Sequence, residues 1–408
     1  MQGISLKQTF SALRHYNYRL WFFGQLFSLV GTWMQTTAQG YLVFTLTNSA
    51  AYLGLVTFAS GVPAIVFSLY GGVIADRISR RTLLVITQTS MMVLAFILAG
   101  LVFTNVVQPW MILVLSFLLG VANAFDMPAR QAFVVELVDD RTDLVNAIAL
   151  NASMFNLAIV VGPAVSGFTY AWVGPGWCFV INAVSFIAVI IALLLMHVKP
   201  LPVPEKRPSA IAQIKESMHY VLTQKTVLLM IIGLGIVSIF GFGMLNFMPV
   251  WAVDVLNGDV TTNGFLLSAR GVGSLIGALT VAAFSMRGIR GKMWSWGSFL
   301  LPAMMIVFAI SPWLIPAMVL LVGIGWSLMW VTNNANSLIQ TGIPDEMRGR
   351  VMSVYAVVLQ GGGPLGSLVI GGITSVSNAP LSAIVCGIML LGFALYIWFT
   401  YPQMRVLE

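Results

Sequence analysis

The residues of this chain that could do chemistry are an acid and a base placed within an apolar stretch. Asn123, Asp126 and Arg130 occupy positions i, i+3 and i+7, so on a helix they share one face. Ionisable groups in such a stretch are costly and usually face a cavity or one another. Pairing with Arg130 favours the ionised form of Asp126, whereas loss of water favours the neutral form. This carboxyl group could therefore bind a proton in one conformation and release it in another. The alternatives are a static ion pair and an arginine that binds an anionic substrate.

Uncharged polar residues form two further stripes at helical spacing, one around Trp33 and one that ends at Gln340. In apolar surroundings such stripes predict a water-filled interior lined by several helices, and helix–helix hydrogen bonds are the alternative for each residue. A neutral cavity with aromatic walls suits an amphipathic or apolar substrate. The candidate cavity residues are Gln25, Thr32, Trp33, Gln35, Asn123, Asn333 and Asn336.

The elements that carry these residues are long apolar runs. Of the 408 residues, 59% are hydrophobic and 8% are charged, whereas soluble domains average about 25% charged residues. The run from Leu83 to Val106 carries no charge and exceeds the ~20 residues that a helix needs to cross the hydrocarbon core. The strict alternation of membrane β-strands is absent. The sequence therefore predicts an all-α membrane protein.

Twelve apolar runs account for most of the chain. If the N-terminus is cytoplasmic, every lysine and arginine except Arg130 and Arg270 falls in a cytoplasmic segment. This bias supports an even number of spans and places both termini in the cytoplasm. Five tryptophans near the predicted outer ends are expected to be interfacial anchors: Trp110, Trp172, Trp177, Trp251 and Trp313. The predicted span cores are 20–44, 51–74, 83–106, 110–135, 145–171, 173–196, 227–253, 262–285, 293–311, 313–339, 351–375 and 379–401.

The polar stretch 199–225 predicts a cytoplasmic linker between six-helix bundles at 1–198 and 226–408. The two halves echo one another in sequence. Gly54 and Gly61 in the second span match Gly264 and Gly271 in the eighth. Parallel repeats of this kind are one plan of secondary transporters, with the substrate site between the repeats. We therefore expect twelve transmembrane helices in two pseudo-symmetric bundles.

The turn after the second span carries the motif Gly71 to Arg81. Its glycines allow close helix contact, and its acid can lie against a helix N-terminus. The motif resembles the signature G-x-x-x-D-R-x-G-R-R of the major facilitator superfamily, with Ser79 where glycine is usual. The resemblance implies a cytoplasmic latch between the halves, which would close against the segment 344–350; the alternative is that the arginines only set topology. The candidate latch residues are Gly72, Asp76, Arg77, Arg80 and Arg81.

The fifth span carries Gly162, Pro163 and Gly167. Proline removes a helical hydrogen bond, and small residues let a neighbouring helix approach. The pattern resembles the antiporter signature g-x-x-x-G-P-x-x-G-G, with Ala158 and Ser166 in place of glycines. The resemblance implies export, and an ordinary kinked membrane helix is the alternative.

A third candidate pair lies near the outer surface. Asp254 is expected at the outer end of the seventh span and Arg270 in the outer part of the eighth. Across a helical hairpin they could form an outer gate. A snorkelling arginine is the alternative.

Longer stretches resemble the enterobactin-exporter-like bacterial branch of the major facilitator superfamily. They are residues 17–21, 31–35, 126–131 and 344–353. The resemblance spans nearly the full chain. It implies the twelve-helix fold, a cavity lined by the first, fourth, seventh and tenth helices, a bacterial inner-membrane location and export of siderophores, drugs or metabolites.

Enzyme chemistry is not indicated. The three histidines form no metal-ligand pattern, no phosphate-binding loop of the G-x-x-x-x-G-K-[ST] type occurs, and Cys178 and Cys386 are expected to be small core residues. No cofactor, metal or nucleic-acid partner is expected, and the net charge of +7 is assigned to topology. We expect a monomeric, proton-driven exporter of a small amphipathic molecule. The alternatives are an uptake symporter or facilitator and a non-transporting receptor or assembly factor.

Overall fold

The computed structural model describes residues 10–138, 140–198, 210–284 and 287–407, and within these it describes no side chains for residues 68–77, 141–142, 210–215 and 406. The described residues are almost entirely helical and contain no strand. The first half contains η1 (Ser11–Arg14), α2 (Tyr16–Thr47), α3 (Ala50–Arg77), α4 (Arg80–Phe103), α5 (Pro109–Phe133), η2 (Val134–Leu137), α6 (Arg141–Val173) and α7 (Pro175–Leu195).

The second half begins with the amphipathic helix α8 (Ala210–Thr223). The remainder of the predicted linker, residues 199–209, lies outside the described residues. Six spans follow, and the seventh of the chain is built from several short pieces. The elements are α9 (Lys225–Ile236), η3 (Val237–Phe242), α10 (Gly243–Leu245), α11 (Met248–Val250), η4 (Trp251–Val255), α12 (Val260–Phe284), α13 (Arg290–Ala309), α14 (Leu314–Gly342), α15 (Asp345–Val376), α16 (Ala379–Thr400) and η6 (Pro402–Val406).

Local sequence explains where the helices begin and end. Pro109 and Pro175 stand in the first turns of α5 and α7, where a missing N–H costs nothing. The Ser79 side chain accepts a hydrogen bond from the Thr82 backbone N–H and caps α4. Asn48 ends α2 in the left-handed conformation (φ 45°), which asparagine tolerates better than most residues.

Within the described residues, eleven helical stretches are long and apolar enough to cross a membrane. The twelfth long helix is α2, which has 32 residues. It is less apolar because it carries the predicted polar stripe, including Gln25, Gln35 and Gln39. The twelve predicted spans thus correspond to twelve long helical stretches.

The seventh span is irregular in a way that the apolar pattern did not predict. Its segments η3 and η4 are π-helical, and a turn at Asn246 and Phe247 interrupts the helix. Pro249 follows the turn and has no N–H to continue the preceding ladder. The interruption leaves the Asn246 side chain free to donate to Ser367 Oγ on α15 at 2.7 Å.

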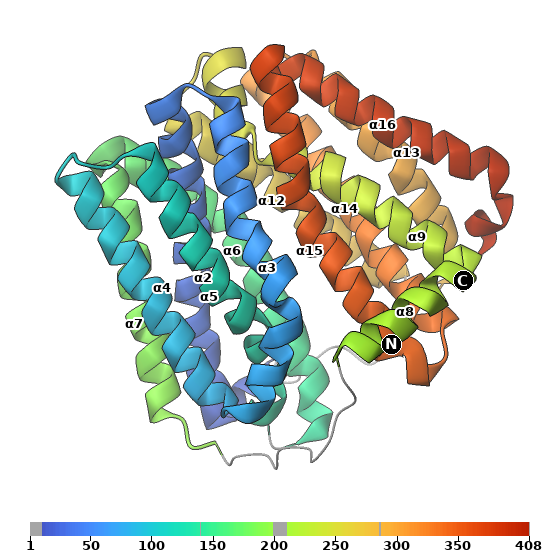
Figure 1. Cartoon of the computed structure of the whole chain (residues 1–408), viewed down its shortest axis with the longest axis horizontal. Coiled ribbons are helices and arrows are strands. Elements are labelled where there is room, and N and C mark those ends of the chain that lie inside the picture. The colour runs from blue at the N-terminus through green and yellow to red at the C-terminus, as the bar shows by residue number, and fades with distance from the viewer. Residues whose placement is uncertain (1–9, 139, 199–209, 285–286, 408) are drawn as a thin grey trace.

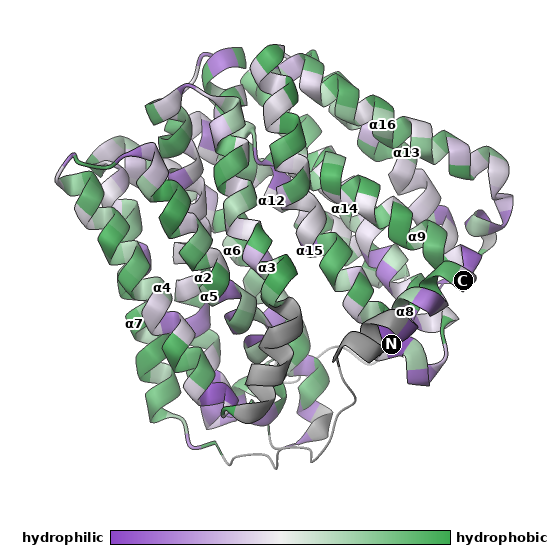
Figure 2. Cartoon of the chain, in the orientation of Figure 1, coloured by the Kyte–Doolittle hydropathy of each residue, from purple (hydrophilic) through white to green (hydrophobic). Residues whose placement is uncertain are grey.

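The two halves form two bundles that lie side by side, α2–α7 in one and α9–α16 in the other (Figure 1). Large apolar side chains such as Leu279, Ile315 and Phe399 are exposed on the surface, as contact with lipid requires. Figure 2 shows the apolar residues along the helices and the hydrophilic residues gathered toward the ends.

The two ends of the molecule differ in composition. We call one the basic end, because it carries Arg80, Arg81, Arg287, Arg290, Arg348 and Arg350 at the helix junctions. We call the other the tryptophan end, because Trp110, Trp172, Trp177 and Trp313 are exposed there. The predicted anchor role of Trp251 is wrong. Its ring is buried and packs on Phe308, with ring centroids 4.5 Å apart.

Glycines form the contact between the bundles along α3 and α15. A Cβ on Gly54 would meet the Ser367 carbonyl oxygen, and a Cβ on Gly61 would meet the Pro364 ring. On α15, a Cβ on Gly371 would lie 2.9 Å from the Ala50 carbonyl oxygen of α3. Only glycine allows the backbones to approach so closely.

A second contact with the same construction joins α6 and α12. A Cβ on Gly264 would lie 2.6 Å from the Pro163 carbonyl oxygen, and one on Gly271 would lie 2.9 Å from that of Ile159. The matched glycines of the two halves therefore occupy two related seams. Both seams lie in the helix portions nearest the tryptophan end, and the bundles diverge toward the basic end (Figure 1).

Candidate functional site: a cavity between the bundles

A cavity of about 250 Å³ lies between the bundles, beside the two seams. Four predicted cavity residues line it, Thr32, Trp33 and Gln35 from α2 and Asn123 from α5. Gln35 is held in place by Asn182 of α7, whose Nδ2 donates to Gln35 Oε1 at 2.7 Å. Sequence reasoning missed Asn182, a polar residue inside the sixth apolar run, and it also lines the cavity.

A second cavity of about 220 Å³ lies farther toward the basic end, between α3 and α5 on one side and α15 on the other. Ile65, Gln131 and Gln360 are among its lining residues. Asn123 belongs to the walls of both cavities and is exposed. The two spaces therefore adjoin at Asn123.

Arg270 of α12 also lines the first cavity. Its guanidinium lies over the Trp33 ring, 5.8 Å from the centroid. Trp33 in turn packs edge-on against Phe155, with centroids 6.1 Å apart. Trp33 gives the cavity an aromatic wall, but the cavity is not neutral as predicted, since it contains the Arg270 cation.

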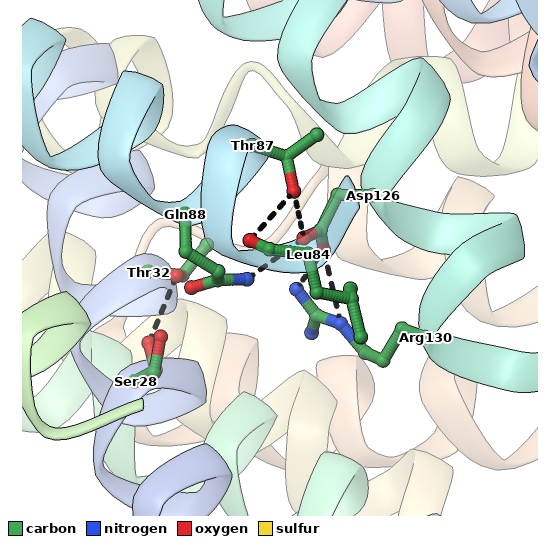
Figure 3. Close-up of polar contacts among 7 residues, drawn as sticks. All are labelled: Ser28, Thr32, Leu84, Thr87, Gln88, Asp126 and Arg130. Atoms are coloured by element: carbon green, nitrogen blue, oxygen red, sulfur yellow. Dashed lines mark hydrogen bonds and ion pairs between the residues drawn. The ribbon is translucent and has the colours of Figure 1, made fainter. Parts of the chain in front are cut away.

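Asp126 and Arg130 form the predicted ion pair, and Asp126 is buried. Arg130 donates two N–H groups to Asp126 Oδ2, with Nε at 3.0 Å. Oδ1 accepts from Thr87 Oγ1 and Gln88 Nε2 of α4, both at 2.8 Å (Figure 3). Both carboxylate oxygens of Asp126 are therefore occupied by donors from α4 and α5.

Gln25 lies beside this ion pair and not in the predicted cavity wall. It is fully buried, and with its amide oxygen toward Arg130 it accepts from Nη1 at 2.5 Å and Nε at 3.2 Å. Residues of α2, α4 and α5 thus meet at one ion pair. Thr87 and Gln88 were missed by sequence reasoning, although they belong to a polar cluster inside an otherwise apolar run.

Comparison with known proteins identifies the family. The sequence model of a family described as transmembrane secretion effectors matches residues 7–408. The chain belongs to this family. It is therefore a membrane transporter of the major facilitator type and not an enzyme.

Curated relatives of this transporter include a staphyloferrin A transporter of Staphylococcus aureus, 23% identical over 95% of this chain and 97% of the relative. The multidrug efflux pump Tap of Mycolicibacterium fortuitum is 26% identical over 95% and 96%. The enterobactin exporter EntS of Escherichia coli is 25% identical over 96% and 93%.

Solved structures show the same fold at lower identity. The nucleoside transporter NupG superposes with a TM-score of 0.71 at 17% identity, over 96% of this chain and 98% of that one. A bacterial homologue of the lysosomal transporter Spinster, described as inward-facing and unoccupied, also gives 0.71 at 13% identity, over 98% and 99%.

The antiporter-like motif of this transporter lies where the seam meets the cavity. A Cβ on Gly162 would lie 3.0 Å from the Val30 carbonyl oxygen and would also strike Trp33, so the glycine lets α6 pack under this ring. Pro163 lines the cavity. A Cβ on Gly167 would lie 3.1 Å from Thr261 Cα on α12. The motif therefore connects a cavity wall to the contact between bundles.

The described latch residues of the transporter bond within their own half. Arg80 pairs with Glu136, and Arg81 donates to the Leu194 carbonyl oxygen at 2.8 Å. The opposite segment bonds within the second half, where Arg350 pairs with Glu216 at 2.5 Å. The side chains of Gly72, Asp76 and Arg77 lie outside the described residues.

Asn333 and Asn336 line neither of the two cavities described above. Asn336 Oδ1 accepts from Gln340 Nε2 at 2.5 Å within α14. Nearby, Trp330 donates to Thr280 of α12 at 2.8 Å. Around this polar stripe the structure favours the alternative of hydrogen bonds within and between helices.

The predicted outer gate is wrong as a pair. Asp254 is exposed and lies beside a separate hollow at the tryptophan end, whereas Arg270 faces the central cavity. No ion pair joins them in the part of the chain that the structure describes. Among the same residues, no group of three His, Cys, Asp or Glu side chains is placed to hold a metal ion.

Proposed function

We propose that this transporter exports a small molecule from the cytoplasm across a bacterial inner membrane by alternating access, driven by protons. The observation that carries the proposal is the cavity between two bundles that touch along glycine seams at one end only. Such a cavity is accessible from one side at a time if the bundles rock about it. Export is supported by the antiporter-like motif at the seam and by the relatives EntS, an enterobactin exporter, and Tap, a multidrug efflux pump.

The basic end is the cytoplasmic end in this proposal, because cytoplasmic loops are enriched in lysine and arginine. The described conformation is then inward-facing. In the outward-facing state the α3–α15 and α6–α12 seams would separate, and the arginines after α3 would close against the start of α15. The bonds that Arg80 and Arg81 make within their own half fit an open latch.

Asp126 is the proposed proton-coupling acid. In this conformation four N–H or O–H groups donate to its two oxygens. A proton would bind after Arg130 or α4 moves away, because the unpaired and buried carboxylate would then favour its neutral form. Because Asp126, Arg130 and α4 all belong to the first bundle, this release would require a rearrangement inside that bundle in addition to the rocking.

Flux in everted membrane vesicles tests the proposal, with three naphthalene probes that carry a cationic, a neutral or an anionic group. Acidification of the lumen should drive uptake of at least one probe, and a protonophore should abolish it.

Asp126→Asn should lose the gradient dependence while passive exchange remains. Asp143→Asn, which removes an acid that pairs with His15 away from the latch, is the matched control. Accumulation in right-side-out vesicles would instead identify an uptake symporter, and absence of flux for all three probes would contradict transport of amphipathic molecules.

A further inference from the structure

Arg270 is a cation in the central cavity with no described acid beside it. Its Nε is buried and has no hydrogen-bond partner, and no ion pair in the described part of the chain includes it. A charge at this depth in a membrane protein is expected to be paired. Its one aromatic neighbour, the Trp33 ring at 5.8 Å, offsets part of this cost but carries no net charge.

The acids of the chain that the structure describes lie elsewhere. Five have cationic partners of their own: Asp126 with Arg130, Glu136 with Arg80, Asp143 with His15, Glu216 with Arg350, and Asp345 with Arg348. Asp140 and Glu346 stand at the basic end.

The two remaining described acids stand at the tryptophan end. Asp259 accepts hydrogen bonds from the backbone of Thr261 and Thr262 at the start of α12, about 16 Å along the helix from Arg270 at 1.5 Å per residue. Asp254 is exposed beside a separate hollow. The protein therefore supplies no described counter-charge to Arg270.

The other polar groups of the cavity are neutral and mostly engaged. Gln35 accepts from Asn182, Gln39 donates to Ser116 at 2.7 Å, and Asn246 donates to Ser367. These amides add hydrogen-bonding capacity but no charge. The cavity is thus a mainly apolar space with one positive pole, next to one aromatic face.

We propose that the transported molecule is an amphipathic carboxylate, with its carboxylate on Arg270 and its apolar or aromatic body against Trp33. A guanidinium offers paired N–H donors that match the two oxygens of a carboxylate. One arginine balances one negative charge, which fits a monoanion better than a phosphate dianion. This inference rests on the proposed transport through the cavity and specifies the class of substrate.

Binding to the purified full-length protein in detergent tests this assignment without any gradient. The probes are 1-naphthaleneacetate and its neutral amide, 1-naphthaleneacetamide, which share the aromatic body and differ in charge. Titration calorimetry should show that the wild type binds the carboxylate about tenfold more tightly or better, as for a charge-assisted hydrogen bond. Arg270→Gln should bind both probes equally, and Arg270→Lys should keep part of the preference.

Arg287→Gln is the matched control, because Arg287 also stacks on an aromatic ring, Phe284 at 4.8 Å, but lies at the basic end outside the cavity. It should bind as the wild type does. A thiol-reactive dye that reports the buried Cys178 and Cys386 on heating verifies that each variant is folded.

Each outcome of the titration decides the assignment. Equal affinity of the wild type for both probes, no saturable binding of the carboxylate at millimolar concentration, or a preference that survives in Arg270→Gln would overturn the carboxylate assignment and leave the transport proposal standing. Binding that depends on Arg270 without any vesicle flux would instead refute transport.

Discussion

At the scale of single residues, the centre of the first bundle is a buried carboxylate that depends on one arginine. Asp126 receives two N–H groups from Arg130, and Thr87 and Gln88 occupy its other oxygen. Removal of one partner from a buried pair leaves the other charge buried without a counter-charge. Removal of both partners leaves no buried charge. The pair should therefore behave as a unit in mutational experiments.

Arg130→Gln should lower the free energy of unfolding by about 3–5 kcal/mol, because Asp126 would remain buried and unpaired. The double variant Asp126→Asn/Arg130→Gln should recover most of this loss. Thermal unfolding, followed by the reaction of the buried Cys178 and Cys386 with a thiol-reactive dye, measures the loss in the single variant and the recovery in the double variant. A double variant as unstable as the sum of the two single variants would contradict a mutual pairing.

The sequence predicted this pair because both residues lie on one helix, where spacing fixes distance. It did not predict Thr87 and Gln88, since their contact with Asp126 depends on how α4 packs against α5. The same limit explains Arg270. The sequence showed that Arg270 lies within an apolar run. Whether its side chain faces an acid, lipid or a cavity depends on tertiary packing, which the sequence pattern does not give.

At the scale of elements, the seams are the contacts that must break for the bundles to rock. Each seam relies on glycines of both halves, so an added methyl group there should push the helices apart. Hydropathy predicted the spans well because a helix in lipid must expose apolar side chains. It could not predict the interruption of the seventh span at Asn246. That break depends on local turn chemistry and on the hydrogen bond to α15.

Gly371→Ala should destabilise the closed seam and increase access to the cavity from the tryptophan end. Gly372→Ala is the control, because a Cβ at Gly371 would lie 2.9 Å from a backbone oxygen whereas one at Gly372 meets nothing within 4 Å. Labelling of a Thr57→Cys probe in the cavity wall by a membrane-impermeant maleimide on whole cells reports the access. Equal labelling rates in the two variants would show that this seam does not control the outer side.

At the scale of the whole molecule, the structure would be one member of the proposed two-state cycle. The bundles meet at the tryptophan end and diverge toward the basic end (Figure 1). The seams were not predicted, whereas the twelve-span plan and the relation between the halves followed from apolar runs and from glycines that recur in both halves. The conformational state did not, because both states must satisfy the same sequence.

A reversible covalent lock across one seam should hold the transporter in this state. Gly167→Cys and Thr261→Cys together place thiols on adjoining positions of α6 and α12. Oxidation should abolish flux in everted vesicles, whereas a thiol-specific label should still reach Gln360→Cys from the basic end. Flux should return on reduction, and each single cysteine variant should be indifferent to oxidation. Undiminished flux in the oxidised double variant would refute rocking about this seam.

The polar stripe of α2 also bears on how the protein is made. This helix is synthesised before α5 and α7, yet among the described residues it is the long helix that fails the apolarity that the other eleven stretches meet. An insertion machinery that sorts segments by hydrophobicity would retain α2 poorly until α5 and α7 are made, because Gln25 and Gln39 bond to residues of α5 and Gln35 bonds to Asn182 of α7. The polar side chains of α2 should thus make its stable insertion into the bilayer depend on these later helices.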